Sequence, residues 1–301
     1  MKNSNFKFEI HFPVLLNEVL EYLNPKPNEN FVDCTFGGGG HALAILEKTK
    51  PNGKVLGIEI DPELYKIAKE KIKHERLILV RDSFLNLKKI IERENFRPIA
   101  GIFFDLGISS WHLEKSKRGF SFLRKEPLIM RYDADLTKLT AAEVVNNWTK
   151  EEIEKILREF GQEKFAKKIA KAICKEREKK KIETTTELVK IIEKAVPSFY
   201  KKRKIHFATK TFLALRIVVN EELENLKKGL KEAMEMLDKK GKLVVISFHS
   251  LEDKIVKNFF KEQEREGKLR ILTKKPISPK KEEILKNPRS RSAKLRAAVK
   301  I

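Results

Sequence analysis

The stretch VDCTFGGGGHALAIL (residues 32–46) places four consecutive glycines between a strand-like apolar run and a helix-like run. A residue without a side chain lets the backbone turn sharply and lets a ligand approach it closely. Asp33 precedes the glycines in the order Asp-x-x-x-Gly-x-Gly. A strand, a glycine-rich turn and a helix in this order predict a ligand site at the end of the first strand of an α/β fold.

Short apolar runs alternate with helical patterns along the first third of the chain. They predict strands at 31–36, 54–60, 76–82 and 98–107, with helices between them, one of which starts at Pro62. The pattern returns near the end, with helices over 208–237 and 251–264 and strands at 239–250, 268–275 and 292–301. This alternation predicts an α/β fold with a mostly parallel, doubly wound sheet, whose ligands bind at the carboxyl ends of the strands.

The middle of the chain lacks strand patterns. Residues 108–139 are loop-like. The pattern from Thr140 to Pro197 predicts successive helices, with Thr184–Thr186 as candidate N-caps of one of them. We therefore predict a discontinuous ligand-binding domain, residues 1–112 and 206–301, interrupted by an inserted helical substrate-recognition domain, residues 113–205.

Charge is the strongest signal in the composition. The chain has 65 Lys and Arg against 43 Asp and Glu, which gives a net charge of +22. A thermophile-type surface would explain the abundance of charge but not the imbalance, because ion-pair networks need both signs. The surplus favours a polyanionic partner, with nucleic acid ahead of a membrane.

The remaining bulk features predict a soluble cytoplasmic protein. No apolar run reaches membrane-spanning length, and the first residues, MKNSNFKFEIHF, lack a secretory pattern. Cys34 and Cys174 have neither zinc spacing nor the number needed for a disulfide framework. His11, His74 and His206 also lack the spacing of metal ligands, so we expect no metal.

Two classes of ligand fit the glycines. Gly37, Gly39 and Ala42 match the dinucleotide fingerprint G-x-G-x-x-G/A, and Glu59 ends the next strand at a suitable distance, so a nicotinamide- or flavin-dependent oxidoreductase is one reading. S-adenosylmethionine (SAM) binds at the same place on similar sheets. Asp33 separates the two, because a carboxylate there would attract a cationic amino group and repel a pyrophosphate. The structural alternative is that Asp33 only stabilises the turn.

Further side chains at the predicted strand ends suit SAM. Glu59 can accept hydrogen bonds from both ribose hydroxyls. After the third strand, Asp82 can accept from the adenine amino group, and Phe84 can lie against the adenine face, although Phe84 suits a core position equally well. Asp105 ends the fourth strand, where it would face the transferred methyl group.

Several motifs together resemble one family. TFGGGGH, RGFSF, ISFHSLED and NPRSRSAKLR are similar to the bacterial 16S rRNA cytosine-N4 methyltransferases, the RsmH/MraW family, and the resemblance extends from residue 11 to the tail. It implies a Rossmann-like (class I) SAM-dependent methyltransferase domain with a helical insert. It also implies N4-methylation of a cytidine, position 1402 of 16S rRNA, in the decoding centre of the small ribosomal subunit.

The resemblance implies a set of cofactor-binding residues. Glu59 stands where the family commonly has Asp, and His112 stands where it commonly has Gln. Asp33 and Asp82, at strand ends, and Gly37, in the glycine-rich turn, are further candidates because of their positions. The positions implied by the family are Gly39, Gly40, His41, Glu59, Phe84, Asp105 and His112.

Two residues are candidates for the chemistry. The cytosine amino group is a poor nucleophile, so a side chain that accepts its proton or holds the donor would help. Asp105 is our candidate for that role, with SAM binding alone as the alternative. His249 follows a predicted strand, and we predict that it contacts the target, whereas Ser250 with Asp253 resembles the start of a capped helix.

Basic and aromatic residues predict an RNA interface. Arginine suits phosphate, and an aromatic ring suits a flipped-out base. We expect the small ribosomal subunit as partner and no membrane. A homodimer is left open, as is a non-catalytic RNA-binding module. Phe122 more readily anchors its loop, and Lys201–Lys204 form a basic joint. The predicted RNA contacts are Arg118, Phe120 and Arg131 in the loop after the fourth strand, with Arg289, Arg291, Lys294 and Arg296 in the tail.

Overall fold

The computed structural model describes residues 13–135 and 137–301. Residues 1–12 and 136 lie outside the described part, and with them His11 and the beginning of the family-like segment. The chain forms two compact units. The first comprises the chain up to Ser109 together with Leu223–Ile301, and the second is Ser110–Glu222.

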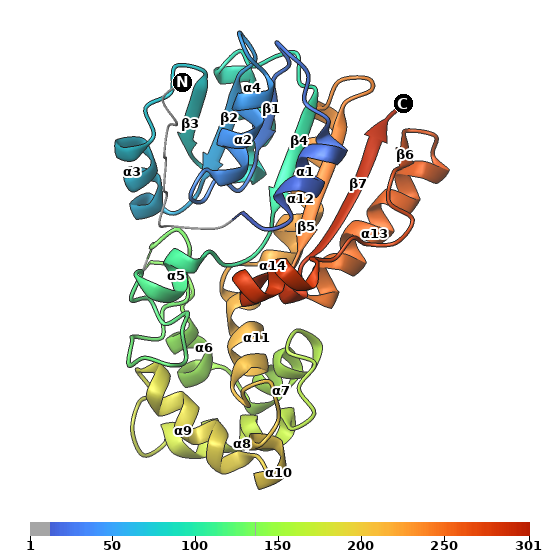
Figure 1. The fold of residues 1–301 in the computed structure, drawn as a ribbon. Helices are drawn as coiled ribbons and strands as arrows, with labels where there is room; N and C mark the ends of the chain where they lie inside the picture. Colours follow the sequence, from blue (N-terminus) through green and yellow to red (C-terminus); the bar gives the residue numbers. More distant parts are fainter. Residues whose placement is uncertain (1–12, 136) are drawn as a thin grey trace. The chain divides into compact units, whose positions relative to one another are not determined.

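A seven-stranded sheet forms the centre of the first unit (Figure 1). The strand order is β3-β2-β1-β4-β5-β7-β6, and all pairs are parallel except those that β7 makes with β5 and β6. The predicted mostly parallel α/β sheet is therefore confirmed. The strands are β1 (Phe31–Asp33), β2 (Val55–Glu59), β3 (Leu77–Arg81), β4 (Gly101–Asp105), β5 (Lys242–Ser247), β6 (Leu269–Ile271) and β7 (Lys294–Lys300).

Helices cover both faces of this sheet. Alternate strand residues point to opposite faces, so Phe31 packs with α1, α2 and α3, whereas Val32 packs with α4, α12 and α13. Both side chains are at most 1% exposed. The helices of this unit are α1 (Leu16–Leu23), α2 (Gly40–Lys48), α3 (Pro62–Lys71), α4 (Leu87–Arg93), α12 (Glu222–Met236), α13 (Ser250–Arg265) and α14 (Lys281–Lys286), with 3₁₀ turns η1 (Phe84–Asn86) and η2 (Pro288–Ser292).

The regular elements of the second unit are all helices, as the sequence predicted (Figure 1). Helices α7, α8 and α9 pack in succession, and α11 packs against α6 and α7. Thr184 caps α9, and its capping box is completed by the side chain of Glu187. The helices are α5 (Ser110–Glu114), α6 (Ala141–Asn147), α7 (Lys150–Glu159), α8 (Ala166–Arg177), α9 (Thr185–Ala195), α10 (Ser198–Lys201) and α11 (Thr209–Val219).

The structure divides the chain at different points from the proposed domains. The sequence placed the second boundary at 205/206, but the compact unit extends to Glu222, because α11 packs against the helices of the insert. The first boundary lies at Ser109 rather than 112, and the loop-like segment that follows contains the short helix α5. No helix of the described residues combines the length and the apolar character needed to cross a membrane.

Candidate active site

Three carboxylates lie at one edge of the sheet. Asp33, Glu59 and Asp105 are the last residues of β1, β2 and β4, and these strands are parallel neighbours in the order β2-β1-β4. The structure therefore brings together the acids that the sequence placed at strand ends. His249 follows β5, the next parallel strand, at the same edge.

The glycine-rich turn is shaped by close contacts. Gly37 and Gly39 have φ of +53° and +76°, in the left-handed region that favours glycine. A Cβ on Gly39 would lie 2.7 Å from the ring of Phe36, and a Cβ on Gly57 of β2 would lie 2.3 Å from the same ring. Phe36 is thus wedged between the turn and β2, and it holds the turn close to the strand ends.

Glu59 is tied to this turn. Its Oε2 accepts a hydrogen bond from the Gly37 N–H at 2.9 Å, and its Oε1 accepts one from the Asp61 N–H at 2.8 Å. Burial raises the pKa of Glu59 to about 7, and the nearby charge of Asp61 raises it too, while the two N–H donors oppose the shift. Each oxygen keeps a further lone pair that a ligand hydroxyl can use.

Asp33 is buried and linked to the third acid. Its Oδ1 accepts from the Thr35 N–H at 3.1 Å, and burial raises its pKa to about 7. The Thr35 hydroxyl in turn accepts from the Asp105 N–H at 2.6 Å, so one residue joins β1 to the end of β4. Thr35 was not among the predicted site residues, although its hydroxyl, two positions after the strand-end acid, was an available signal.

Asp105 is the least satisfied of the three. Its Oδ1 is buried without a hydrogen-bond partner among the described residues. Burial raises the pKa of Asp105 well above its ordinary value, and the charges of Asp33 and Glu252 add to the shift. Its Oδ2 lies 3.7 Å from the Nδ1 of His41, which is in the first turn of α2.

A buried, unpartnered carboxylate oxygen fits a cationic ligand. The acids together offer acceptors to an ammonium group, to ribose hydroxyls and to a sulfonium centre, which is the chemistry of SAM. The residues present therefore fit this cofactor. A pyrophosphate, by contrast, would meet carboxyl groups that repel it when they are ionised and offer it few hydrogen-bond donors.

The two predicted adenine contacts, Asp82 and Phe84, already interact with other residues of the first unit. Asp82 uses Oδ1 to accept from the Ser83 N–H at 2.7 Å and from the Asn86 side chain at 2.8 Å. Phe84 packs edge-on against Phe104 at 5.5 Å, and a Cβ on Gly229 would lie 2.7 Å from its ring. Phe84 is therefore part of the packing between α12 and the sheet. Only the part of its ring that stays accessible could contact a ligand.

The structure corrects the expected helix start after β5. The N-cap of α13 is His249, not Ser250, and its box partner is Glu252, not Asp253. The His249 Nδ1 accepts from the Glu252 N–H at 3.4 Å, while a Glu252 carboxylate oxygen accepts from the His249 N–H at 3.3 Å. His249 thus has a local structural role.

The predicted RNA contacts of the second unit lie within its own framework. Arg118 donates from Nη1 to the carbonyls of Arg131 and Tyr132, each at 2.9 Å, and its guanidinium lies 5.4 Å from the Trp111 ring. Phe120 stacks on Tyr132 at 5.3 Å. These side chains thus have a role in shaping the loop, and their direct contacts with phosphate and base stay a prediction.

Arg131 and His112 are also engaged within this unit. Arg131 forms a two-pronged pair with Asp133 at 2.6 and 2.7 Å, and its Nη1 donates to two carbonyls, those of Leu139 and Val219. The His112 ring lies among aromatic rings, 5.0 Å from that of Tyr132. The contact of His112 with SAM stays a prediction, and the other predicted donor-site residues all belong to the first unit.

The tail divides into exposed and buried cations. Arg289 and Arg291 are exposed on η2. Arg296 is 7% exposed and pairs with Asp253 at 2.7 Å, and Lys294 reaches the same carboxylate at 3.4 Å.

The strand order and the acid-lined edge define an α/β protein of the methyltransferase type. A family model described as the MraW methylase family matches residues 8–301, so the chain belongs to that family. The resemblance seen in the sequence motifs is confirmed, as is the prediction of a methyltransferase. Family membership also favours this reading over an oxidoreductase or a non-catalytic RNA-binding module.

Relatives cover nearly the whole chain. It is 47% identical over 293 residues to the ribosomal RNA small subunit methyltransferase H of Persephonella marina, covering 97% of this chain and 99% of that protein. It is 48% identical to the protein of the same name from a Sulfurihydrogenibium species, with the same coverage. A solved rRNA methylase of Streptococcus thermophilus has a TM-score of 0.44 at 10% identity, covering 95% of this chain and 93% of that one.

Proposed function

We propose that this protein uses SAM to methylate the N4 amino group of a cytidine, position 1402, in 16S rRNA of the small ribosomal subunit. The observation that carries the proposal is the acid cluster of Asp33, Glu59 and Asp105 beside a glycine-rich turn, in a chain of the MraW methylase family. The net charge of +22 supports an RNA substrate. The cytoplasm, where ribosomal RNA is found, is the proposed compartment.

The donor would be held by first-unit residues. SAM, when bound, supplies an electrophilic methyl group on a sulfonium. Glu59 would accept hydrogen bonds from the ribose hydroxyls, and Asp33 would face the amino group. Gly39 and Gly40 lie at the start of α2, whose positive end favours the carboxylate of the amino-acid part. Asp82 and Phe84 would border the adenine.

Asp105 would act on the cytosine amino group. Its free Oδ1 can accept a hydrogen from that group, which helps to orient the nitrogen lone pair for in-line attack. A neighbouring sulfonium charge favours the ionised form of Asp105, which is the form able to accept a proton. Correct positioning alone can supply roughly 7–11 kcal/mol of the barrier.

The direct test is methyl transfer from labelled SAM to small subunits that lack the modification. We expect label in a cytidine of 16S rRNA, and nuclease mapping should place it at position 1402. Label confined to protein or DNA, or none in rRNA, would refute the proposal. Enhanced nicotinamide fluorescence without SAM binding would favour the oxidoreductase reading instead.

A further inference from the structure

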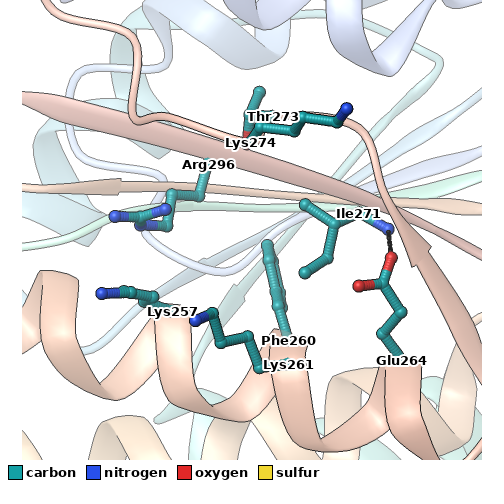
Figure 2. Close-up of a pocket in the computed structure, with 8 residues that line it drawn as sticks. All are labelled: Lys257, Phe260, Lys261, Glu264, Ile271, Thr273, Lys274 and Arg296. Carbon is teal, nitrogen blue, oxygen red and sulfur yellow. Dashed lines mark hydrogen bonds between the residues drawn. The ribbon is translucent and has the colours of Figure 1, made fainter.

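A groove lies at the far edge of the sheet, between α13 and the strands β6 and β7 (Figure 2). It has a volume of about 250 Å³ and lies wholly within the first unit. Four of its lining residues are cationic and one is acidic. The lining residues are Lys257, Phe260, Lys261, Glu264, Ile271, Thr273, Lys274 and Arg296.

Most of the cations in the groove have no acidic partner. Lys257 and Lys261 are four residues apart on α13, so they share a helix face, and like charges at this spacing repel each other. Neither they nor Lys274 form an ion pair with any described residue. The single acid, Glu264, is engaged by the Ile271 N–H at 2.8 Å.

One cation of the groove is fixed in place. Arg296 is held by Asp253, which accepts from its Nε at 2.7 Å and from its Nη2 at 3.3 Å. Figure 2 shows that Lys257 and Lys261 rise from α13 beside Phe260 and that the guanidinium of Arg296 lies on the same side. A guanidinium held in place near two exposed ammonium groups is an arrangement that suits a phosphate.

The groove offers little for reading a base. Phe260 is only 1% exposed, so its ring forms the floor and presents no stacking face. The Thr273 hydroxyl accepts from the Ala297 N–H at 2.9 Å and is already used. The volume is also below the roughly 300–1,000 Å³ of small-molecule sites. The ligand group that fits this lining is therefore a backbone phosphate. Contacts to phosphate position a nucleic acid without specifying its sequence.

We propose that this groove binds a backbone phosphate of the RNA substrate, away from the methyl-transfer edge, and so anchors the RNA on the first unit. The proposal rests on the proposed function only in taking RNA as the polyanion. Lys294, which shares Asp253 with Arg296, connects the groove to the exposed arginines of the tail.

The test compares two double variants of the full chain that lose the same charge. Lys257→Gln with Lys261→Gln removes two groove cations, and Lys228→Gln with Lys231→Gln removes two exposed lysines from α12 of the same unit. Affinity for a 16S rRNA fragment is measured from 50 to 200 mM salt. For the groove variant we expect about tenfold weaker binding at 0.1 M salt and a salt slope that is smaller by about 0.7–0.9 for each phosphate that the groove no longer neutralises.

Lys257→Arg with Lys261→Arg should keep the affinity of the wild type, because the charge is retained. SAM affinity should be unchanged in all variants. If the groove variant loses no more affinity and no more salt slope than the control, the groove proposal is wrong. If the wild type binds RNA through the groove yet transfers no methyl group, the groove stands and the proposed function fails.

Discussion

The Nδ1 of His41 lies 3.7 Å from the Oδ2 of Asp105, and the hydrogen bonding of the ring determines what that nitrogen can do. The His41 Nε2 is 2.9 Å from the Val14 carbonyl oxygen, which can only accept, so Nε2 carries a proton. In a neutral ring, Nδ1 then presents a lone pair toward the carboxyl group. A proton on Asp105 would remove the repulsion between this lone pair and a carboxylate, in agreement with the raised pKa of Asp105.

This relationship gives a test of Asp105. Asp105→Asn preserves shape and can still donate to His41, but it cannot accept a proton from cytosine. We expect turnover at saturating SAM to fall by about 10²–10⁴ while the unfolding free energy changes little. Single-turnover methylation and SAM titration separate the roles, because a change confined to SAM affinity would show that Asp105 only binds the donor.

Glu59 should bind the ribose through charge-assisted hydrogen bonds. Glu59→Ala removes at least one of these, at roughly 1.5–3 kcal/mol, so we expect SAM affinity to fall by at least about 10–100-fold. It also frees the Gly37 N–H, which loosens the glycine-rich turn. Calorimetric titration measures the change, with exposed Glu70→Ala on α3 as the control. Equal affinity in the two variants would exclude the role.

Most of the sheet and its acids were predictable, whereas their partners were not. Strand and helix patterns located all seven strands, and strand-end position, together with the spacing to the glycines and the family resemblance, singled out Asp33, Glu59 and Asp105. The short helices α1, α5 and α14 were missed because five to eight residues give little periodicity. The N-cap of α13 was predicted as Ser250 instead of His249, because serine is a preferred cap and histidine an uncommon one.

The arginines show a second limit. Sequence shows a guanidinium in a loop but not whether the loop's own carbonyls will use its donors. Arg118 and Arg131 bind such carbonyls, whereas Arg291 is exposed on η2. The two situations require coordinates to distinguish, because an arginine in a basic loop can adopt either of them.

SAM affinity should depend on pH. Asp33 and Glu59 have pKa values of about 7, so both are mostly neutral at pH 5.5 and mostly ionised at pH 7.5. A cationic ligand favours the ionised forms, so affinity should rise with pH across this interval, by at most about tenfold per pH unit for each group, and then level off. Asp33→Asn should make the profile shallower, because only the part due to Glu59 then remains. A wild-type affinity that is constant from pH 5.5 to 7.5 would contradict the assignment.

The packing of Phe36 makes Gly57 a test of the turn. In Gly57→Ala the new Cβ would meet the Phe36 ring at 2.3 Å, so the ring must move and the turn it supports must move with it. We expect a loss of about 1–3 kcal/mol in the free energy of unfolding, together with weaker SAM binding. Urea denaturation and SAM titration check both effects. Gly267→Ala is the control: its φ of +68° costs some stability, but its Cβ would meet no atom within 4 Å, so SAM affinity should be unchanged.

Arg131 should stabilise the second unit rather than contact RNA. Burial opposes ionisation of Asp133, but hydrogen bonds from Arg131 and Lys138 outweigh it and lower the pKa of Asp133 to about 2. Arg131→Gln leaves this carboxylate and two carbonyls poorly paired, so we expect about 3 kcal/mol less unfolding free energy. Arg291→Gln, at an exposed tail position, should leave stability unchanged and reduce the salt dependence of RNA binding. If Arg131→Gln instead keeps full stability in urea denaturation and selectively weakens RNA binding, direct phosphate contact by Arg131 is the better account.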